Sequence, residues 1–397
     1  MARCVVRTGF AGFQHAVVIV FYTLMAAFPA AAADIDFKII RLPVTIDGSQ
    51  LSLEAVVATP PGPGPFPVAL LTHGSPPPDG TPEELSAESN FGEWSLNMAS
   101  RGYLAVGIMR RGYGFSDGVP GTGGGDCAQP KPELRMQRDA ADLAAALQAV
   151  ALWPQADMSR VVAMGQSLGG AAVLALAARA DVHLAAAVSI SGGIYHRQGH
   201  EVPKAFHVYD QCPLYRKALV DAVGHLAASS PAPQLWIYAE NDPWFRPDLV
   251  EDMRQVSATS GGKVEAQILP PSVINGHAVL FRPEGMAEIL PVLDDFLRAH
   301  DLLTWKGDDY QGLRARLLPD QRKDLDTYLR QGVTQKALAV ASNGNGHLHW
   351  IEGSTVLDRA ERQAIETCEK DEKTACRLLM ANFDPLPPAQ TASADTP

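Results

Sequence analysis

Ser167 stands in a pattern that is typical of a catalytic nucleophile. It lies in Gly165-Gln166-Ser167-Leu168-Gly169, after the apolar run 161–164 and before an Ala- and Leu-rich segment, 170–179. At a strand-to-helix turn, the serine hydroxyl is exposed, and flanking glycines let neighbouring backbone pass without Cβ clashes. The sequence therefore predicts that Ser167 is a nucleophile rather than an ordinary turn serine.

An acid and a base follow Ser167 in the order that such a nucleophile needs. A serine hydroxyl is a weak nucleophile until a base takes its proton, and the base needs a carboxylate to fix its orientation. Asp242 stands directly after a predicted strand, and His277 stands in Asn275-Gly276-His277 after the next one. We predict His277 as the general base and Asp242 as its orienting acid.

Other residues compete for these two roles. Glu240 lies beside Asp242 at the end of the same predicted strand, and Asp242 has an alternative role as a cap for the segment 243–253. His225 precedes the strand of the acid, and His300 ends an amphipathic segment where a histidine often faces solvent or the helix dipole.

A tetrahedral intermediate also needs hydrogen-bond donors for its oxyanion. One predicted donor is the backbone N–H of Leu168, and the other comes from the loop His73-Gly74-Ser75-Pro76. Proline has no N–H, which leaves Gly74 and Ser75, and we choose Ser75. The alternative is that His73-Gly74 only turns the chain.

The segments that must position these residues alternate between strand and helix. Residues 37–46 and 51–59 are joined by Asp47-Gly48, which predicts an antiparallel hairpin. Apolar runs then recur with helical patterns between them, the clearest helix being 134–152. This alternation predicts an α/β fold with a mostly parallel sheet covered by helices on both faces, where sites gather at the carboxyl ends of strands. The runs are 68–72, 104–109, 161–164, 184–190, 235–239 and 264–269.

Five motifs in one order give residues 34–300 a resemblance to the α/β-hydrolase superfamily, in its dienelactone-hydrolase-like and prolyl-oligopeptidase-like branch. The motifs are His73-Gly74-Ser75, Arg111-Gly112-Tyr113-Gly114-Phe115-Ser116-Asp117-Gly118, Gly165 to Gly169, Tyr238 to Asp242, and Gly276-His277. The resemblance implies the α/β-hydrolase fold and a catalytic triad of Ser167, Asp242 and His277. The dienelactone hydrolases use a cysteine nucleophile, so dienelactone is not an expected substrate here.

Substrate choice is expected to lie in an insertion at about 192–231. Its aromatic residues either line an acyl or leaving-group pocket or form the packing core of a small lid. They are Tyr195, His196, Phe206, His207, Tyr209 and Tyr215.

The composition is that of an acidic globular protein. The chain has 397 residues, 46% of them hydrophobic, and 33 Lys and Arg against 44 Asp and Glu give a net charge of −11. Phosphate binding needs a basic stripe, whereas the longest run of basic residues is the pair Arg110-Arg111. We expect no nucleic-acid partner, no metal and no organic cofactor.

Residues 1–33 have the pattern of a secretory signal peptide. Arg3 and Arg7 precede an apolar run, 16–30, which is followed by the small residues Ala31-Ala32-Ala33 that suit a cleavage site. The alternative is an uncleaved membrane anchor. We expect cleavage, export to the periplasm or the medium, and no stable membrane insertion of the mature chain.

Four cysteines follow the predicted signal. In an exported chain an even number favours disulfides, and the short spacing of Cys368 and Cys376 predicts that pair first, with Cys127 and Cys212 paired by elimination. The alternatives are four reduced thiols or a zinc site that uses His347 and His349.

The C-terminal third changes in pattern. Residues 302–334 are polar and predict a helical linker, and 335–383 predict a small α+β domain stapled by Cys368 and Cys376. The Pro-, Ala- and Thr-containing end, 384–397, predicts a disordered tail. The partner and role of the small domain are unknown.

Taken together, the sequence predicts an exported serine hydrolase, 34–301, that cleaves a small-molecule carboxylic ester through an acyl-enzyme at Ser167. A serine peptidase is the second interpretation, because an amide substrate uses the same triad. A catalytically silent binding protein on this fold is the third.

Overall fold

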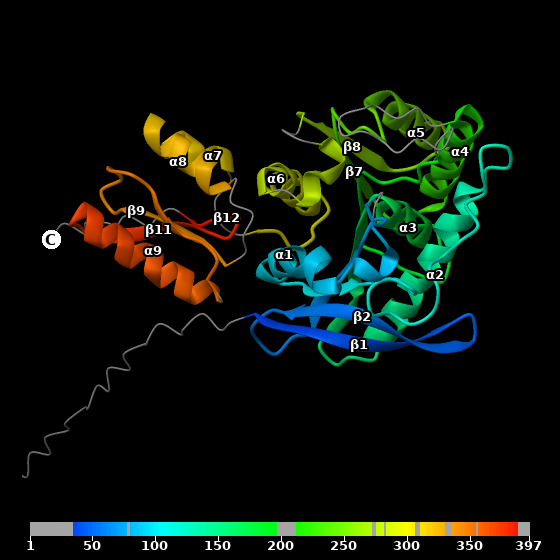
Figure 1. Ribbon diagram of the computed structural model, residues 1–397, viewed down its shortest axis with the longest axis horizontal. Coiled ribbons are helices and arrows are strands. Elements are labelled where there is room, and N and C mark those ends of the chain that lie inside the picture. The colour runs from blue at the N-terminus through cyan, green and yellow to red at the C-terminus, as the bar shows by residue number, and fades with distance from the viewer. Residues whose placement is uncertain are drawn as a thin grey trace, which may run out of the picture. The chain divides into compact units, whose positions relative to one another are not determined.

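An eight-stranded sheet is the centre of the structure, a computed structural model that describes residues 35–77, 80–196, 212–271, 275–281, 283–305, 310–329, 335–354 and 356–387. Its strand order is β1-β2-β4-β3-β5-β6-β7-β8. β1 and β2 lie at one end of the sheet, and β7 and β8 lie at the other (Figure 1). β1, β2 and β4 are antiparallel neighbours, and the strands from β4 to β8 are parallel. The strands are β1 Asp36–Ile46, β2 Ser49–Thr59, β3 Phe66–Thr72, β4 Leu104–Ile108, β5 Ala156–Gln166, β6 Ala186–Ile190, β7 Gln234–Ala239 and β8 Val264–Leu269.

The predicted hairpin is formed by β1 and β2. Their two-residue turn has positive φ at both Asp47 (51°) and Gly48 (78°), and Ile46 pairs with Ser49 across it. A turn with two positive φ angles matches the twist of the strands, and Asp-Gly is a sequence that adopts it readily.

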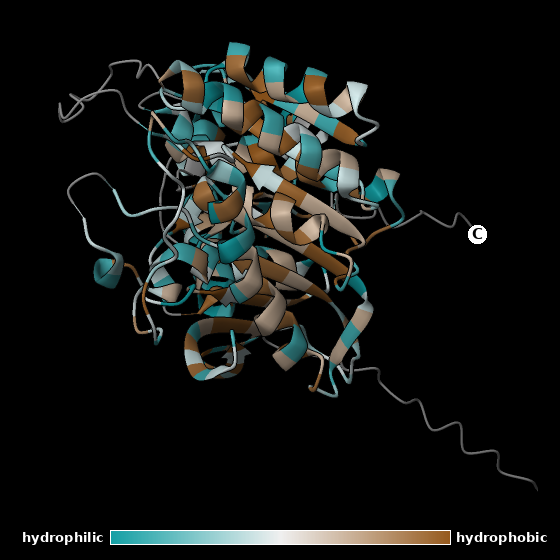
Figure 2. Ribbon diagram, turned by 90° about the vertical axis from the view of Figure 1, so that its right-hand side faces the viewer, coloured by the Kyte–Doolittle hydropathy of each residue, from teal (hydrophilic) through white to brown (hydrophobic). Residues whose placement is uncertain are grey.

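Helices cover both faces of this sheet (Figure 1). Every residue of β4 and β6 is buried, as expected for parallel strands with both faces covered. In Figure 2 the central strands are mostly brown, whereas the helices carry teal residues as well. The predicted α/β-hydrolase fold is confirmed. One face carries α1 (Ala87–Ser100) and α6 (Pro283–Ala299), and the other carries α2 (Pro132–Val150), α3 (Leu168–Ala177), α4 (Pro213–Ser229) and α5 (Pro247–Thr259).

The C-terminal residues form a second, four-stranded sheet in the order β10-β9-β11-β12. The Cys368–Cys376 disulfide joins its helix α9 to β11. The predicted helical linker contains two short helices, and the predicted domain boundaries stay predictions. The elements are α7 Tyr310–Arg316, α8 Pro319–Leu329, β9 Ala337–Ala341, β10 His349–Ile351, α9 Leu357–Glu372, β11 Cys376–Ala381 and β12 Asp384–Pro385.

The start of the expected disordered tail is instead ordered. Asp384 is buried, and its carboxylate lies 3.1 Å from the Arg101 guanidinium and accepts a hydrogen bond from the Ser100 hydroxyl at 3.2 Å. Arg101 also donates two hydrogen bonds to Asp294. A buried cation needs charged partners, and this requirement fixes Asp384 in place. Residues 388–397 lie outside the described residues.

The predicted signal peptide, 1–33, also lies outside the described residues. Within the part of the chain that the structure describes, no helix combines the length and the apolar character that a membrane span needs.

The first turn of α3 packs directly against the end of β3. A Cβ added at Gly169 would lie 2.3 Å from the His73 carbonyl oxygen and 2.8 Å from that of Thr72. Both atoms belong to the backbone, Thr72 as the last residue of β3 and His73 as the next, so neither can yield without moving the end of a central strand.

We predict opposite effects for two Gly→Ala substitutions in helices. Gly169→Ala should destabilise the protein by about 1–3 kcal/mol through overpacking. Gly92→Ala in α1, where a Cβ meets nothing within 4 Å, should stabilise it by about 0.5–1 kcal/mol because alanine is the better helix former. Denaturant unfolding of both variants measures the two signs, and a stabilised Gly169→Ala protein would contradict the packing argument.

Candidate active site

Ser167 occupies a strained turn between β5 and α3. Its backbone has φ 54° and ψ −122°, a conformation that costs a non-glycine residue about 1–3 kcal/mol. The turn is held because the Ser167 N–H donates to the Ile190 carbonyl at 2.9 Å and the Gly193 N–H donates to the Ser167 carbonyl at 3.1 Å. Gly165 is required here, since a Cβ on it would lie 2.3 Å from the Gly169 carbonyl oxygen.

The structure brings Ser167, His277 and Asp242 together in a hydrogen-bonded chain. His277 Nε2 lies 3.0 Å from the Ser167 hydroxyl oxygen, and His277 Nδ1 lies 3.0 Å from Asp242 Oδ2. The Asp242 side chain is fully buried, whereas 17% of the His277 side chain is exposed. A buried carboxylate, an imidazole and a hydroxyl in this order can pass a proton from the serine to the histidine.

Further hydrogen bonds hold Asp242 and His277 in place. The other oxygen of the Asp242 carboxylate accepts hydrogen bonds from the N–H groups of Trp244 at 2.9 Å and Phe245 at 3.0 Å. The His277 N–H donates to the Asn275 side chain at 2.9 Å, and the Gln166 side chain donates to the His277 carbonyl at 3.1 Å.

The competing residues lie elsewhere. Glu240 is exposed at the surface beside the end of β7. His225 lies 3.2 Å from Glu133, and His300 lies 3.0 Å from Glu265, both as exposed pairs.

A cavity of about 600 Å³ opens above Ser167 and His277, and the two predicted oxyanion donors, Ser75 and Leu168, line it as well. This volume is within the usual range for small-molecule sites. Leu168 is the first residue of α3, so its N–H belongs to the donors that a helix cannot satisfy internally. An aromatic pair, Tyr195 and Trp244, forms part of the wall with ring centroids 4.7 Å apart.

Arg110 holds the backbone of the predicted oxyanion loop, residues 73–76, a role that the sequence analysis missed. Its buried guanidinium donates to the carbonyls of His73 at 2.6 Å and Gly74 at 3.4 Å, and to the Thr72 hydroxyl at 2.7 Å. In a trans peptide the N–H of Ser75 points opposite to the carbonyl of Gly74. Bonds that turn the Gly74 carbonyl towards Arg110 therefore turn the Ser75 N–H away from it.

His73 supports the same loop in its neutral form. Its Nε2 accepts the Arg110 backbone N–H at 3.0 Å, so its proton lies on Nδ1, which is 2.7 Å from the Gly74 carbonyl. Burial, and after it the neighbouring Arg110, lowers the pKa of His73 well below its ordinary value. The ring thus stays neutral at neutral pH and acts as a spacer rather than as a second base.

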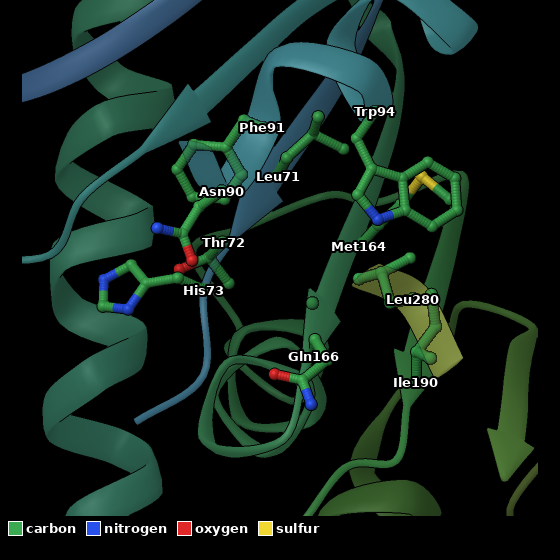
Figure 3. Close-up of a pocket in the computed structure, with 11 residues that line it drawn as sticks. Leu71, Thr72, His73, Asn90, Phe91, Trp94, Met164, Gln166, Ile190 and Leu280 are labelled. Atoms are coloured by element: carbon green, nitrogen blue, oxygen red, sulfur yellow. The ribbon is translucent and has the colours of Figure 1, made fainter. Parts of the chain in front are cut away.

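A much smaller cavity of about 10 Å³ lies behind this loop (Figure 3). Side chains from β3, α1, β5 and β6 surround it, and Gln166 lines both cavities. The volume corresponds to about one water molecule. Leu71, Trp94, Met164, Ile190 and Leu280 make most of its wall apolar.

The predicted insertion is described only in part. Residues 197–211, with Phe206, His207 and Tyr209, lie outside the described residues. Tyr195, His196 and Tyr215 line the large cavity. Cys212, which directly precedes α4 as its N-cap, forms a disulfide with Cys127, so the two disulfides join the same pairs that the sequence analysis favoured.

Of the two histidines of the zinc alternative, His349 lies 2.9 Å from Glu372 and His347 lies 3.3 Å from Asp324. Among the described residues, no group of three or more His, Cys, Asp or Glu side chains is arranged to hold a metal ion.

We predict that Arg110→Met lowers kcat for a p-nitrophenyl ester by about 10- to 100-fold, because loss of a whole oxyanion donor costs about 100- to 1,000-fold. Arg111→Met is the matched control, since Arg111 contacts Asp142 and Asp47 instead of the loop. It should lower stability but leave kcat within about threefold. Equal kcat values for the folded Arg110→Met and wild-type proteins would contradict the role of Arg110.

The sequence and the fold were compared with known proteins. A sequence model of the family described as X-Pro dipeptidyl-peptidase (S15 family) matches residues 47–241, a range that contains Ser167 and ends just before Asp242. The comparison with curated proteins found no match.

Several solved structures are similar to this chain. One is the acylaminoacyl peptidase of Pyrococcus horikoshii, with 18% identity over 69% of this chain and 43% of that one and a TM-score of 0.46. An esterase of Pyrococcus furiosus has 16% identity over 67% of this chain and 93% of that one, with a TM-score of 0.46. Dipeptidyl peptidase 4 of Porphyromonas gingivalis has 17% identity over 63% and 33%, with a TM-score of 0.41.

The match to this chain thus spans less than half of the acylaminoacyl peptidase. The family match includes the turn that carries Ser167, and the sheet has the strand order and the strand-turn-helix of the hydrolase fold. The chain therefore has the fold of the α/β-hydrolase superfamily.

Proposed function

We propose that this protein is an exported esterase that hydrolyses carboxylic esters through an acyl-enzyme at Ser167. The observation that carries the proposal is the hydrogen-bonded chain from Ser167 through His277 to Asp242, at the floor of an open cavity.

In the first half of the reaction the Ser167 hydroxyl attacks the ester carbonyl while His277 Nε2 takes its proton. The buried Asp242 carboxylate keeps the proton of the neutral ring on Nδ1 and stabilises the imidazolium that forms. The N–H groups of Leu168 and Ser75 bind the oxyanion of the tetrahedral intermediate. His277 then gives its proton to the departing alcohol, and the acyl group stays on Ser167.

In the second half, water attacks the acyl-enzyme with His277 as base, and the acid leaves as Ser167 recovers its proton. The exposed edge of His277 and the open cavity give water access to this step.

A serine peptidase is the second candidate, and the match to the X-Pro dipeptidyl-peptidase family over residues 47–241 favours it. Amide hydrolysis uses the same steps with an amine as leaving group. The ratio of kcat/KM for X-Pro p-nitroanilides to that for p-nitrophenyl esters decides between the two. A catalytically silent binding protein, the third candidate, would cleave neither.

Export is part of the proposal. The disulfides Cys127–Cys212 and Cys368–Cys376 support it, because such bonds persist in oxidising compartments.

We predict that a fluorophosphonate labels the wild-type protein and leaves Ser167→Ala unlabelled. Asp242→Asn should lower kcat for p-nitrophenyl esters by about 10,000-fold, since the wrong tautomer of His277 is then stabilised. Glu240→Gln is the matched control at the neighbouring exposed carboxylate and should keep the wild-type rate. Labelling retained by Ser167→Ala, or a full rate in Asp242→Asn, would contradict the assignment.

We also predict that the exported protein begins at Asp34. N-terminal sequencing of protein from the periplasm or the medium tests this, and an Ala33→Tyr variant should remain uncleaved because the site needs a small residue there. A mature protein that keeps residues 1–33 would support the membrane-anchor alternative.

A further inference from the structure

The large cavity has one permanently charged side chain among its described lining residues, Arg135. Arg135 lies in the first turns of α2, and 17% of its side chain is exposed. Its Nε donates to Asp139 at 2.9 Å and its Nη2 donates to the Tyr113 hydroxyl at 3.2 Å. No hydrogen bond joins its Nη1 to another described residue, so part of the guanidinium fork remains for a ligand.

Arg135 shares its carboxylate partner with a second guanidinium. The Asp139 carboxylate that binds it also lies 3.9 Å from the buried Arg110 guanidinium. Arg111 contacts the buried Asp142 and Asp47, whose side chain is 73% exposed. The network therefore holds three guanidinium groups and three carboxylates, and the Asp139 carboxylate serves both Arg110 and Arg135. A partly buried guanidinium that shares its carboxylate is stabilised when a further anion binds beside it.

A hydroxyl donor lies next to Arg135 on the same wall. A Cβ added at Gly124 would lie 3.1 Å from the Tyr215 hydroxyl oxygen and 3.6 Å from Arg135 Cβ, so Gly124 packs closely against both residues. Burial raises the pKa of Tyr215 to about 12, which keeps its hydroxyl protonated at neutral pH. His196 stacks on the Tyr215 ring with centroids 5.2 Å apart and holds it against the cavity.

The rest of the cavity wall suits an apolar body. Ile194, the pair Tyr195 and Trp244, and Phe245 line the same cavity. A ligand that fills it therefore meets an apolar surface, one cationic fork and one hydroxyl, in addition to Ser167.

Resting on the proposed esterase activity, we propose that the natural substrate carries a free carboxylate, bound by the Arg135 guanidinium and the Tyr215 hydroxyl while the ester carbonyl lies at Ser167. A planar guanidinium fork matches a carboxylate with two parallel hydrogen bonds.

Two matched pairs of esters test the proposal. In one pair the charge is on the acyl side: the mono-4-nitrophenyl ester of adipic acid is compared with the analogue in which a primary amide replaces the free carboxylate. The other places it on the leaving group, as 4-carboxyphenyl hexanoate against 4-carbamoylphenyl hexanoate. Arg135→Met should lower kcat/KM for the anionic ester of at least one pair by about 10- to 100-fold and leave the neutral esters within about threefold.

Two further variants sharpen the result. Tyr215→Phe should lower kcat/KM for the same anionic ester by about 3- to 10-fold. Arg138→Met is the matched control, since Arg138 lies one turn further along α2 and donates to the Thr122 carbonyl outside the cavity lining. It should change neither ester of a pair.

A binding measurement keeps the subsite separate from the chemistry. Trp244 lines the cavity, so its fluorescence can follow titration with benzoate or benzamide. Benzoate should bind the wild-type protein at least about tenfold more tightly than benzamide, and Arg135→Met should abolish this difference. Equal binding of the two, or equal losses on anionic and neutral esters in Arg135→Met, would overturn the carboxylate subsite. Failure of fluorophosphonate labelling would contradict the esterase proposal alone.

Discussion

The left-handed backbone at Ser167 is the constraint on which the site depends. It is maintained because β3, β5, β6 and α3 meet at their ends with no room for side chains at Gly165 and Gly169. Backbone hydrogen bonds from Ser167 to Ile190 and from Gly193 to Ser167 then hold the turn in a single conformation. The packing of the whole sheet thus maintains the strained backbone at Ser167, and no contact with a substrate is needed for this.

The two sides of the cavity differ in how they use charge. On the triad side, the Asp242 carboxylate is held by backbone N–H groups of Trp244 and Phe245. On the opposite side, Arg110 and Arg135 share Asp139, and Arg110 at the same time positions the oxyanion loop. A ligand anion would therefore be stabilised beside Arg135 rather than beside Asp242. The proposed oxyanion and the proposed substrate carboxylate both depend on this asymmetry.

Local patterns in the sequence were sufficient for the hairpin, the parallel strands and the turn at Ser167, because each depends on residues close together in the chain. Asp242 and His277 could be chosen by their order after strands. Arg110 and Arg135 could not, because their partners are remote in sequence, 22 residues away for Arg135 and Tyr113 and 38 for Arg110 and Thr72, and no spacing marks them. α1 was not predicted, since its Ser, Asn and Gly residues blur the helical period. Asp384 was placed in a tail because its buried partner, Arg101, is remote in sequence.

The disulfide Cys127–Cys212 also affects the free energy of unfolding, because it restricts the unfolded chain. It joins residues 85 positions apart, and the closed loop contains β5, the Ser167 turn and β6. By the entropy of loop closure, such a link restricts the unfolded chain by roughly 4–5 kcal/mol, whereas Cys368–Cys376, 8 positions apart, contributes roughly 2–3 kcal/mol. Domains of this kind are stable by only about 5–15 kcal/mol in total. A protein made in a reducing compartment would lack both disulfides. It would therefore lose a large part of its free energy of unfolding.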